Sequence, residues 1–188
     1  MLALVGCRDG KTTADSYFAV GWEGELRSPL FLNDCVGAGR GSPALFEPDP
    51  TGWMRATAVG DVALRCGEKG VWHVHVREAA RYQVNAPTSL TAGDRSSASL
   101  EGFDADGNRL SLGVHADVTW KLDGSVREAD RLPHDFIGPA LERLGSFPSI
   151  SIEGTATGPA TITATHLRGR PIDARATLTV TAAPSPPR

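Results

Sequence analysis

The residues best suited to chemistry are two histidines, His73 and His75, which are separated by a single position. Successive side chains of a β-strand alternate between its faces, so both imidazoles would project from the same face. Trp72, Val74 and Val76 alternate with them and would face a core, which places the histidines outside. Imidazole nitrogens are common zinc ligands. The pattern therefore indicates either a metal site completed from elsewhere in the chain or two exposed histidines.

Motifs for nucleophilic catalysis and for nucleotide binding are missing from the sequence. It holds no G-x-S-x-G nucleophile elbow, no phosphate-binding P-loop and no dinucleotide-binding fingerprint. No cysteine stands beside a candidate base. We therefore expect a non-catalytic protein without a cofactor.

A short polar run, Asp104, Asp106 and Asn108 around Gly107, is similar to the start of a calcium-binding loop. The EF-hand pattern requires a carboxylate at its twelfth position, where this chain has His115. Asp-Gly is also a strong signal for the turn of a β-hairpin. A solvated hairpin turn is the favoured interpretation, with calcium binding as the alternative.

The composition favours an all-β protein. With 21 glycines, 13 prolines and 6% aromatic residues in 188 positions, the chain suits short strands and frequent turns. A net charge of -3 provides no positive surface for nucleic acid or an anionic membrane. No segment reaches the ~20 apolar residues of a membrane-spanning helix.

Two segments show the same alternation and position the candidate residues. Residues 62–77 have inward-facing residues on both sides of Gly70, and residues 149–165 repeat the pattern around Gly158. Each predicts a half-buried β-hairpin. The two glycines are 88 positions apart (158 minus 70), which predicts one supersecondary unit used twice. Residues 114–122 predict a further strand with Trp120 in the core.

The N-terminal segment is apolar up to Cys7 and polar after it. Leu4-Val5-Gly6-Cys7 resembles the lipobox of bacterial lipoproteins, which implies cleavage before Cys7 and a diacylglycerol on its thiol. Residues 1–6 are shorter than a complete signal peptide, so we expect a start further upstream or a trimmed chain. The alternative is an apolar tail with an incidental cysteine. The resemblance implies an exported protein anchored to the bacterial envelope, at the outer membrane or cell surface.

The two remaining cysteines, Cys35 and Cys66, are 31 positions apart (66 minus 35) and belong to no CxxC pair. Neither has a companion at zinc-finger spacing. With Cys7 assigned to lipid, we expect the two to form a disulfide, which suits a small module in an oxidising compartment. Two separate buried thiols are the alternative.

The second half of the chain resembles the bacterial immunoglobulin-like domains of group 2, the invasin and intimin type, over about 95 residues. The segments that carry the resemblance are Ser89-Leu90-Thr91-Ala92-Gly93, Asp106-Gly107-Asn108, Val118-Thr119-Trp120, Gly158-Pro159-Ala160-Thr161-Ile162-Thr163-Ala164 and Ala176-Thr177-Leu178-Thr179-Val180. The resemblance implies a β-sandwich that serves as a spacer or adhesive unit on bacterial surfaces.

These features predict an all-β protein with two tandem immunoglobulin-like β-sandwich modules, the first small and disulfide-bonded. The predicted organisation is a residual signal and lipobox (residues 1–7), a flexible tether (8–16), a small module (17–82), a group 2 sandwich (83–182) and a disordered tail (183–188).

One stretch, residues 123–146, breaks the strand pattern. It is either a loop whose apolar residues cover an open end of the sandwich or a loop that contacts a partner. The candidate contact residues combine apolar and basic side chains: Arg131, His134, Phe136, Ile137 and Leu141.

We expect an exported surface lipoprotein acting as a spacer, scaffold or adhesion module. Its partner would be an envelope or surface protein or a polysaccharide, with no nucleic acid, and it would meet the membrane only through Cys7. The alternative is a carbohydrate- or peptide-binding accessory module of a larger envelope assembly. An exposed row of aromatic residues would favour sugar binding, but Trp72 and Trp120 fall on inward-facing positions.

Overall fold

The computed structural model describes residues 5–8, 11–24, 35–36, 45–48, 54–66, 70–113, 116–129 and 148–184. The described residues form strands, turns and connections without a helix, which confirms the predicted all-β class. None of them belongs to a helix long and apolar enough to cross a membrane.

The described residues divide into two compact units. Unit 1 comprises those up to Arg81 together with residues 102–113, and unit 2 comprises the others. The two units differ from the predicted modules in their limits: residues 102–113 belong to unit 1, whereas the sequence analysis placed them in the second module, residues 83–182.

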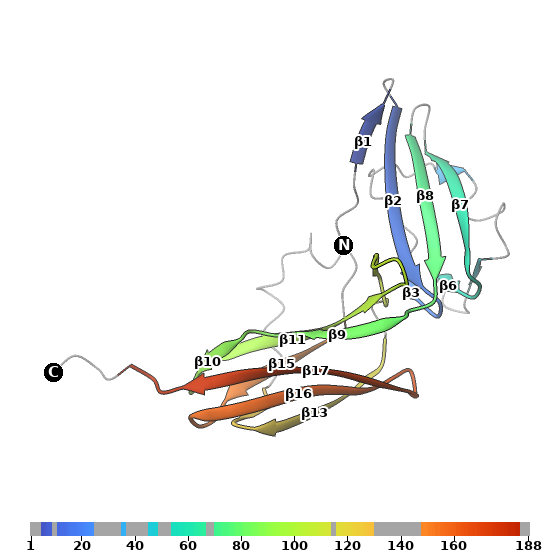
Figure 1. Ribbon diagram of the computed structural model, residues 1–188. Helices are drawn as coiled ribbons and strands as arrows, with labels where there is room; N and C mark the ends of the chain where they lie inside the picture. Colours follow the sequence, from blue (N-terminus) through green and yellow to red (C-terminus); the bar gives the residue numbers. More distant parts are fainter. Residues whose placement is uncertain are drawn as a thin grey trace. The chain divides into compact units, whose positions relative to one another are not determined.

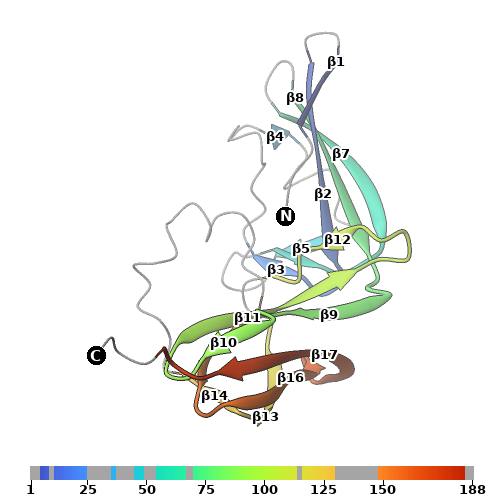
Figure 2. The same ribbon diagram turned by 60° about the vertical axis from the view of Figure 1, so that its left-hand side comes forward.

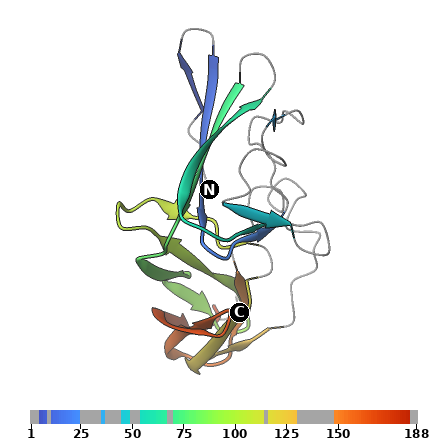
Figure 3. The same ribbon diagram turned by 90° about the vertical axis from the view of Figure 1, so that its right-hand side faces the viewer.

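Unit 1 contains two sheets. The larger has the strand order β1 (Val5–Arg8), β2 (Lys11–Ala19), β8 (Gly70–Arg77), β7 (Gly60–Cys66) and β4 (Cys35–Val36). The smaller has the order β3 (Glu23–Gly24), β6 (Met54–Ala56) and β5 (Phe46–Pro48). β2 and β8 pair in parallel, whereas β7 and β8 form an antiparallel hairpin, as predicted. Figure 3 shows these long strands (blue, green and teal) side by side.

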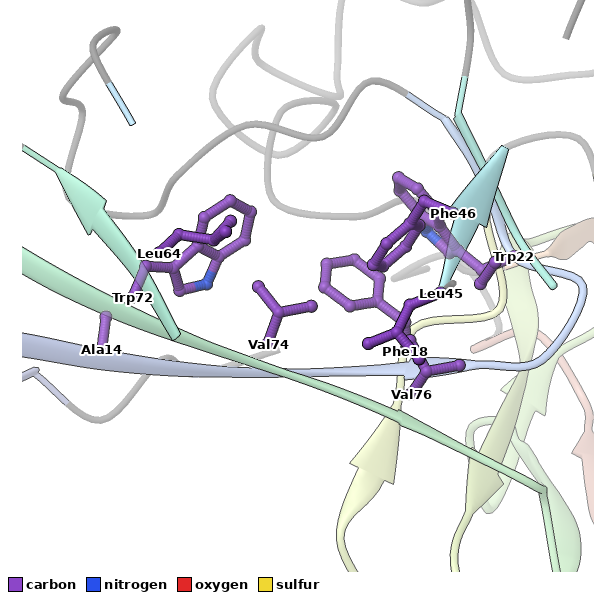
Figure 4. Close-up of a cluster of buried hydrophobic side chains, with 10 residues drawn as sticks. Ala14, Phe18, Trp22, Leu45, Phe46, Leu64, Trp72, Val74 and Val76 are labelled. Atoms are coloured by element: carbon purple, nitrogen blue, oxygen red, sulfur yellow. The ribbon is translucent and has the colours of Figure 1, made fainter. Parts of the chain in front are cut away.

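Inward-facing side chains form the core of unit 1 (Figure 4). Along β8, buried residues alternate with half-buried ones, as expected for a strand with one face in a core. Phe18, Trp22 and Phe46 pack edge to face with ring centroids 4.6 to 6.2 Å apart. The buried indole Nε1 of Trp72 donates a hydrogen bond of 2.9 Å to Ser16 Oγ, so β2 and β8 are joined by a polar contact within an apolar core.

The structure corrects the prediction of a tether over residues 8–16. Residues 11–16 instead form the first part of β2, which pairs with β8 from Thr12↔Gly70 onward. The inward-facing residues of this part, Ala14 and Ser16, are small and buried. A strand lined with small residues on one face and polar residues on the other has no apolar run, so its composition is also typical of a tether.

Unit 2 is a sandwich of two sheets (Figure 2). One sheet has the order β10 (Ser89–Thr91), β17 (Arg170–Thr181), β16 (Gly158–Leu167) and β13 (Val118–Gly124). In the other, β11 (Arg95–Phe103) pairs with β9 (Arg81–Asn85) and β15 (Ser149–Gly154), and β15 pairs with β14 (Val126–Glu128). β10 runs parallel to the last strand, β17. This order is that of an immunoglobulin-like sandwich, with β13, β16 and β17 facing β11, β15 and β14.

The predicted hairpin over residues 149–165 is wrong, although both of its strands exist. β15 pairs with β11 and β14, whereas β16 pairs with β13 and β17, so the chain crosses from one sheet to the other. Both strands have one buried face, and the alternation is therefore the same as in a hairpin. The predicted repeat of one supersecondary unit is also wrong, because of the two segments compared only residues 62–77 form a hairpin.

The Asp106-Gly107 turn joins β11 to the short strand β12 (Arg109–Leu110), as the hairpin signal predicted. The buried carboxylate of Asp104 accepts hydrogen bonds from the backbone N–H groups of Asp106 (3.0 Å) and Asn108 (2.7 Å) and from Asn108 Nδ2 (2.9 Å). Gly107 has a φ of 85°, a conformation that favours glycine. Asp104 therefore organises a turn.

Trp120 was predicted as a central core residue, and the structure corrects this. It lies on the inward face of β13 but is only half-buried, as are Val118 and Leu122. The reason is that β13 is the last strand of its sheet, so no neighbouring strand among the described residues covers one side of the ring.

Candidate functional site

Charged and aromatic side chains gather on the outward face of β2, β8 and β7 in unit 1. The strand registers place Asp61, His75 and Tyr17 side by side, and put Asp15 opposite His73. We call this set, with Arg77 at the end of β8, the polar face: Asp15, Tyr17, Asp61, His73, His75 and Arg77. The alternation of β8 explains its position, because Trp72, Val74 and Val76 occupy the inward face.

His75 lies at the centre of the polar face. Its Nδ1 is 2.5 Å from Asp61 Oδ1, and its Nε2 is 3.1 Å from Asp15 Oδ1. An imidazolium carries a hydrogen on both nitrogens and would donate to both carboxylates at once. Arg77 Nη2 donates to the same Asp61 oxygen over 2.6 Å. These bonds connect three neighbouring strands.

The charges and hydrogen bonds of the polar face shift the pKa values of Asp61 and Tyr17. Hydrogen bonds from His75, and then from Arg77, hold the pKa of Asp61 below its usual value. Burial, and then the negative charge of Asp15, raise the pKa of Tyr17. A tyrosine with a raised pKa stays protonated at neutral pH, so Tyr17 is not an activated base or nucleophile.

Neither metal binding nor sugar stacking is favoured by the ring geometry of the polar face. The rings of His73 and His75 are stacked with centroids 6.5 Å apart rather than converging on one point. No group of three or more potential ligands among the described residues could hold a metal ion. Tyr17 and His75 stack at 4.5 Å with an interplanar angle of 19°, so each ring covers a face of the other.

We expect the Asp61 pairs to make a small, pH-dependent contribution to stability. The folded pKa of Asp61 is lowered, so the pairs stabilise the fold above its unfolded pKa of about 3.9 and lose this effect as the pH falls through the folded value. Because the Asp61 side chain is 60% exposed, Asp61→Asn should lower the free energy of unfolding at pH 7 by less than about 1 kcal/mol.

The measurement is denaturant unfolding of the wild type and of Asp61→Asn from pH 7 to pH 3. The difference between the two should shrink below about pH 4. Asp173→Asn is the control, since Asp173 is exposed and pairs only with Arg175 on its own strand among the described residues. A difference that grows toward low pH would contradict the assignment.

Unit 2 carries a similar row on the outer face of β14, β15 and β11. Glu153 Oε1 accepts a hydrogen bond of 2.9 Å from Arg127 Nη2, and Glu153 Oε2 lies 3.3 Å from Arg95 Nε. The hydrogen bond from Arg127 lowers the pKa of Glu153. In both units, therefore, the carboxylates with lowered pKa values belong to cross-strand pairs on sheet faces.

The structure describes the three cysteines that the sequence analysis singled out but not the residues of the predicted partner loop. The backbone of Cys35 lies directly opposite that of Cys66 in the pairing of β4 with β7. Cys7 lies in β1, opposite Thr12. The residues of the predicted partner loop, Arg131, His134, Phe136, Ile137 and Leu141, lie outside the described residues, as does His115.

No protein-family model matches the sequence, and no curated protein is significantly similar to it. Solved structures that are similar in part include domains 4 and 5 of the S-layer protein SbsC, with 17% identity, a TM-score of 0.35 and 69% of each chain covered. Domains 4–9 of SbsC show 17% identity and a TM-score of 0.36 over 78% of this chain and 21% of that chain. Murine CEACAM1b shows 9% identity and a TM-score of 0.25 over 74% and 68%. These values are too low to transfer a function.

Proposed function

We propose that this protein is a non-catalytic, exported surface lipoprotein whose immunoglobulin-like sandwich serves as a spacer, scaffold or adhesion module. The observation that carries the proposal is the strand order of unit 2, with β10 parallel to β17 and β13, β16 and β17 facing β11, β15 and β14. Sandwiches of this kind have loops at both ends and two solvent-facing sheets, an architecture common in cell-surface domains.

The charges on the two outer faces support a structural role. Asp61 is held by His75 and Arg77, and Glu153 by Arg127 and Arg95. Carboxylates paired in this way across neighbouring strands stabilise the solvent face of a sheet modestly. A catalytic acid or base instead needs a free position beside a substrate.

Two features of the cysteines support export. The lipobox resemblance at Leu4-Val5-Gly6-Cys7 implies processing at a membrane, and the register of Cys35 opposite Cys66 suits a disulfide of an oxidising compartment. If processing occurs before Cys7, Val5 and Gly6 leave β1, and Cys7 and Arg8 remain paired with Thr12 and Lys11. The anchor would then begin directly at the edge of the unit 1 sheet.

The test is expression with the native upstream sequence, followed by fractionation and intact-mass measurement of the wild type and Cys7→Ser. We expect the wild type in the membrane fraction with the mass of attached acyl chains, since two or three chains at ~0.8 kcal/mol per buried CH₂ give stable anchoring. Cys7→Ser should become soluble, whereas Cys35→Ser is the matched control and should stay in the membrane. Equal partitioning and unmodified mass for wild type and Cys7→Ser would refute the anchor.

A further inference from the structure

The strand β13 forms an edge of its sheet in unit 2, with a neighbouring strand on one side only among the described residues. It is the last strand of the order β10-β17-β16-β13 (Figure 1) and pairs only with β16 among the described residues. No bond between two backbone groups outside the strand ladders involves residues 118–124 in the described part of the chain, and the carbonyl of Thr119 accepts a hydrogen bond of 3.2 Å from Thr165 Oγ1 of β16. An edge strand of this kind presents a row of N–H and C=O groups to another strand.

The inward side of β13 is covered less well than that of its neighbour. Ile162 and Ala164 on β16 are 0% exposed, whereas Trp120 and Leu122 on β13 are half-buried. A strand added at this edge would cover the open side of both residues. As far as the structure describes the chain, this edge therefore combines backbone groups that face no strand with half-buried apolar side chains.

The charged side chains of β13 determine which strand can pair with its edge, and in which register. Lys121 and Asp123 both project outward, with side chains 64% and 51% exposed and Nζ 2.9 Å from Oδ2. If two copies of β13 pair antiparallel about Leu122, Lys121 of each lies opposite Asp123 of the other. Pairing about Lys121 or about Asp123 would place like charges opposite each other, which is unfavourable.

The same register also gives the inward side chains of the two copies enough space. Pairing about Leu122 places Trp120 opposite Gly124 of the second copy, and a glycine leaves room for a large ring across the strand pair. Because outward and inward residues alternate, a shift by one residue would lose both matches. Charge and side-chain size thus select one arrangement.

We propose that this protein forms a homodimer through β13, with two antiparallel copies of the strand joining the four-stranded sheets of two sandwiches into one. The interface is isologous, as in most symmetric dimers. The occupant of the edge is a second copy, because the sequence of β13 is complementary to itself. This interface goes beyond the proposed surface role and does not depend on it.

The test uses the full chain in sedimentation equilibrium over a range of protein concentrations. The wild type should show a monomer–dimer equilibrium. Lys121→Asp places two aspartate pairs at the interface and Asp123→Lys two lysine pairs, so each variant should dimerise roughly tenfold more weakly. Arg175→Asp is the matched control, because it makes the same charge change on the same sheet face but on β17, and it should dimerise like the wild type.

Mixing the two variants provides the decisive measurement. Lys121→Asp and Asp123→Lys should form a heterodimer with each other, because both cross-strand charge pairs are then attractive, and the double variant should dimerise like the wild type. Both substituted side chains are exposed, and circular dichroism confirms the fold of each variant. A wild type that is monomeric at all concentrations would overturn the proposal. Dimerisation that neither single substitution weakens, or that mixing does not restore, would also overturn it.

Discussion

Trp72→Ala is expected to destabilise unit 1 by roughly 3–5 kcal/mol, the range for deleting a buried aromatic side chain. Trp72 is 1% exposed and lies on β8, the strand between β2 and β7. The substitution removes packing against the core cluster and also leaves the hydroxyl of Ser16 without its indole donor. A loss of this size is a large fraction of the stability of an ordinary domain.

The measurement is denaturant unfolding followed by circular dichroism, together with hydrogen exchange of the β2 and β8 amides, which reports on unit 1 directly. Ser16→Ala separates the two contributions, because it keeps the ring and removes only the acceptor, at a cost of about 1–3 kcal/mol. Arg65→Ala, an exposed change on neighbouring β7, should stay within about 0.5 kcal/mol of the wild type. A loss below about 1 kcal/mol for Trp72→Ala would mean that the ring is not a core residue.

Loss of the predicted disulfide is expected to have an effect of similar size. Cys35 and Cys66 are directly opposite in an antiparallel pair, and Cα atoms of such pairs are about 4.5–5.5 Å apart. That spacing lies within the roughly 4.4–6.8 Å range of disulfides. The bond would close a loop of 31 positions (66 minus 35), which in the chain-entropy model stabilises by about 3–4 kcal/mol.

Non-reducing peptide mapping of protein from an oxidising compartment should recover one linked peptide containing both cysteines. Reduction, or the paired substitution Cys35→Ser with Cys66→Ser, should lower the free energy of unfolding by the amount above. The comparison is made in a Cys7→Ser background, so that no third thiol can exchange. Recovery of both thiols in alkylated form would show that the cysteines are not joined.

The local features of the fold are the ones that the sequence predicts well. The Asp106-Gly107 turn and the hairpin over residues 62–77 form as predicted, because each depends on neighbouring residues. The pair of Asp61 with His75 could have been derived in the same way, since the hairpin that puts Cys66 opposite Gly70 also puts Asp61 opposite His75. The alternation of side chains along each strand and the position of the turn are enough to predict contacts of this kind.

The errors concern the choice of partner strand. β15 and β16 have the alternation of a hairpin but lie in different sheets, and nothing within residues 149–165 distinguishes these outcomes. Asp15 reaches His75 only because β2 pairs with β8, far along the chain. Half-burial of Trp120 follows from the place of β13 at a sheet edge. Each depends on tertiary structure, which alternation does not encode.

The parallel pairing of β2 with β8 has a consequence for the order of folding. Residues 12–19 of β2 each pair 58 positions ahead (70 minus 12), from Thr12↔Gly70 to Ala19↔Arg77, whereas the β7–β8 hairpin closes between Cys66 and Gly70. Closing the longer loop costs more chain entropy, so the hairpin should form first and β2 should dock onto it later. During synthesis or translocation from the N-terminus, β2 therefore emerges well before its partner. Until β8 follows, the backbone groups of β2 that will face β8 lack their partner strand, although β1 can already pair with β2 through its short turn.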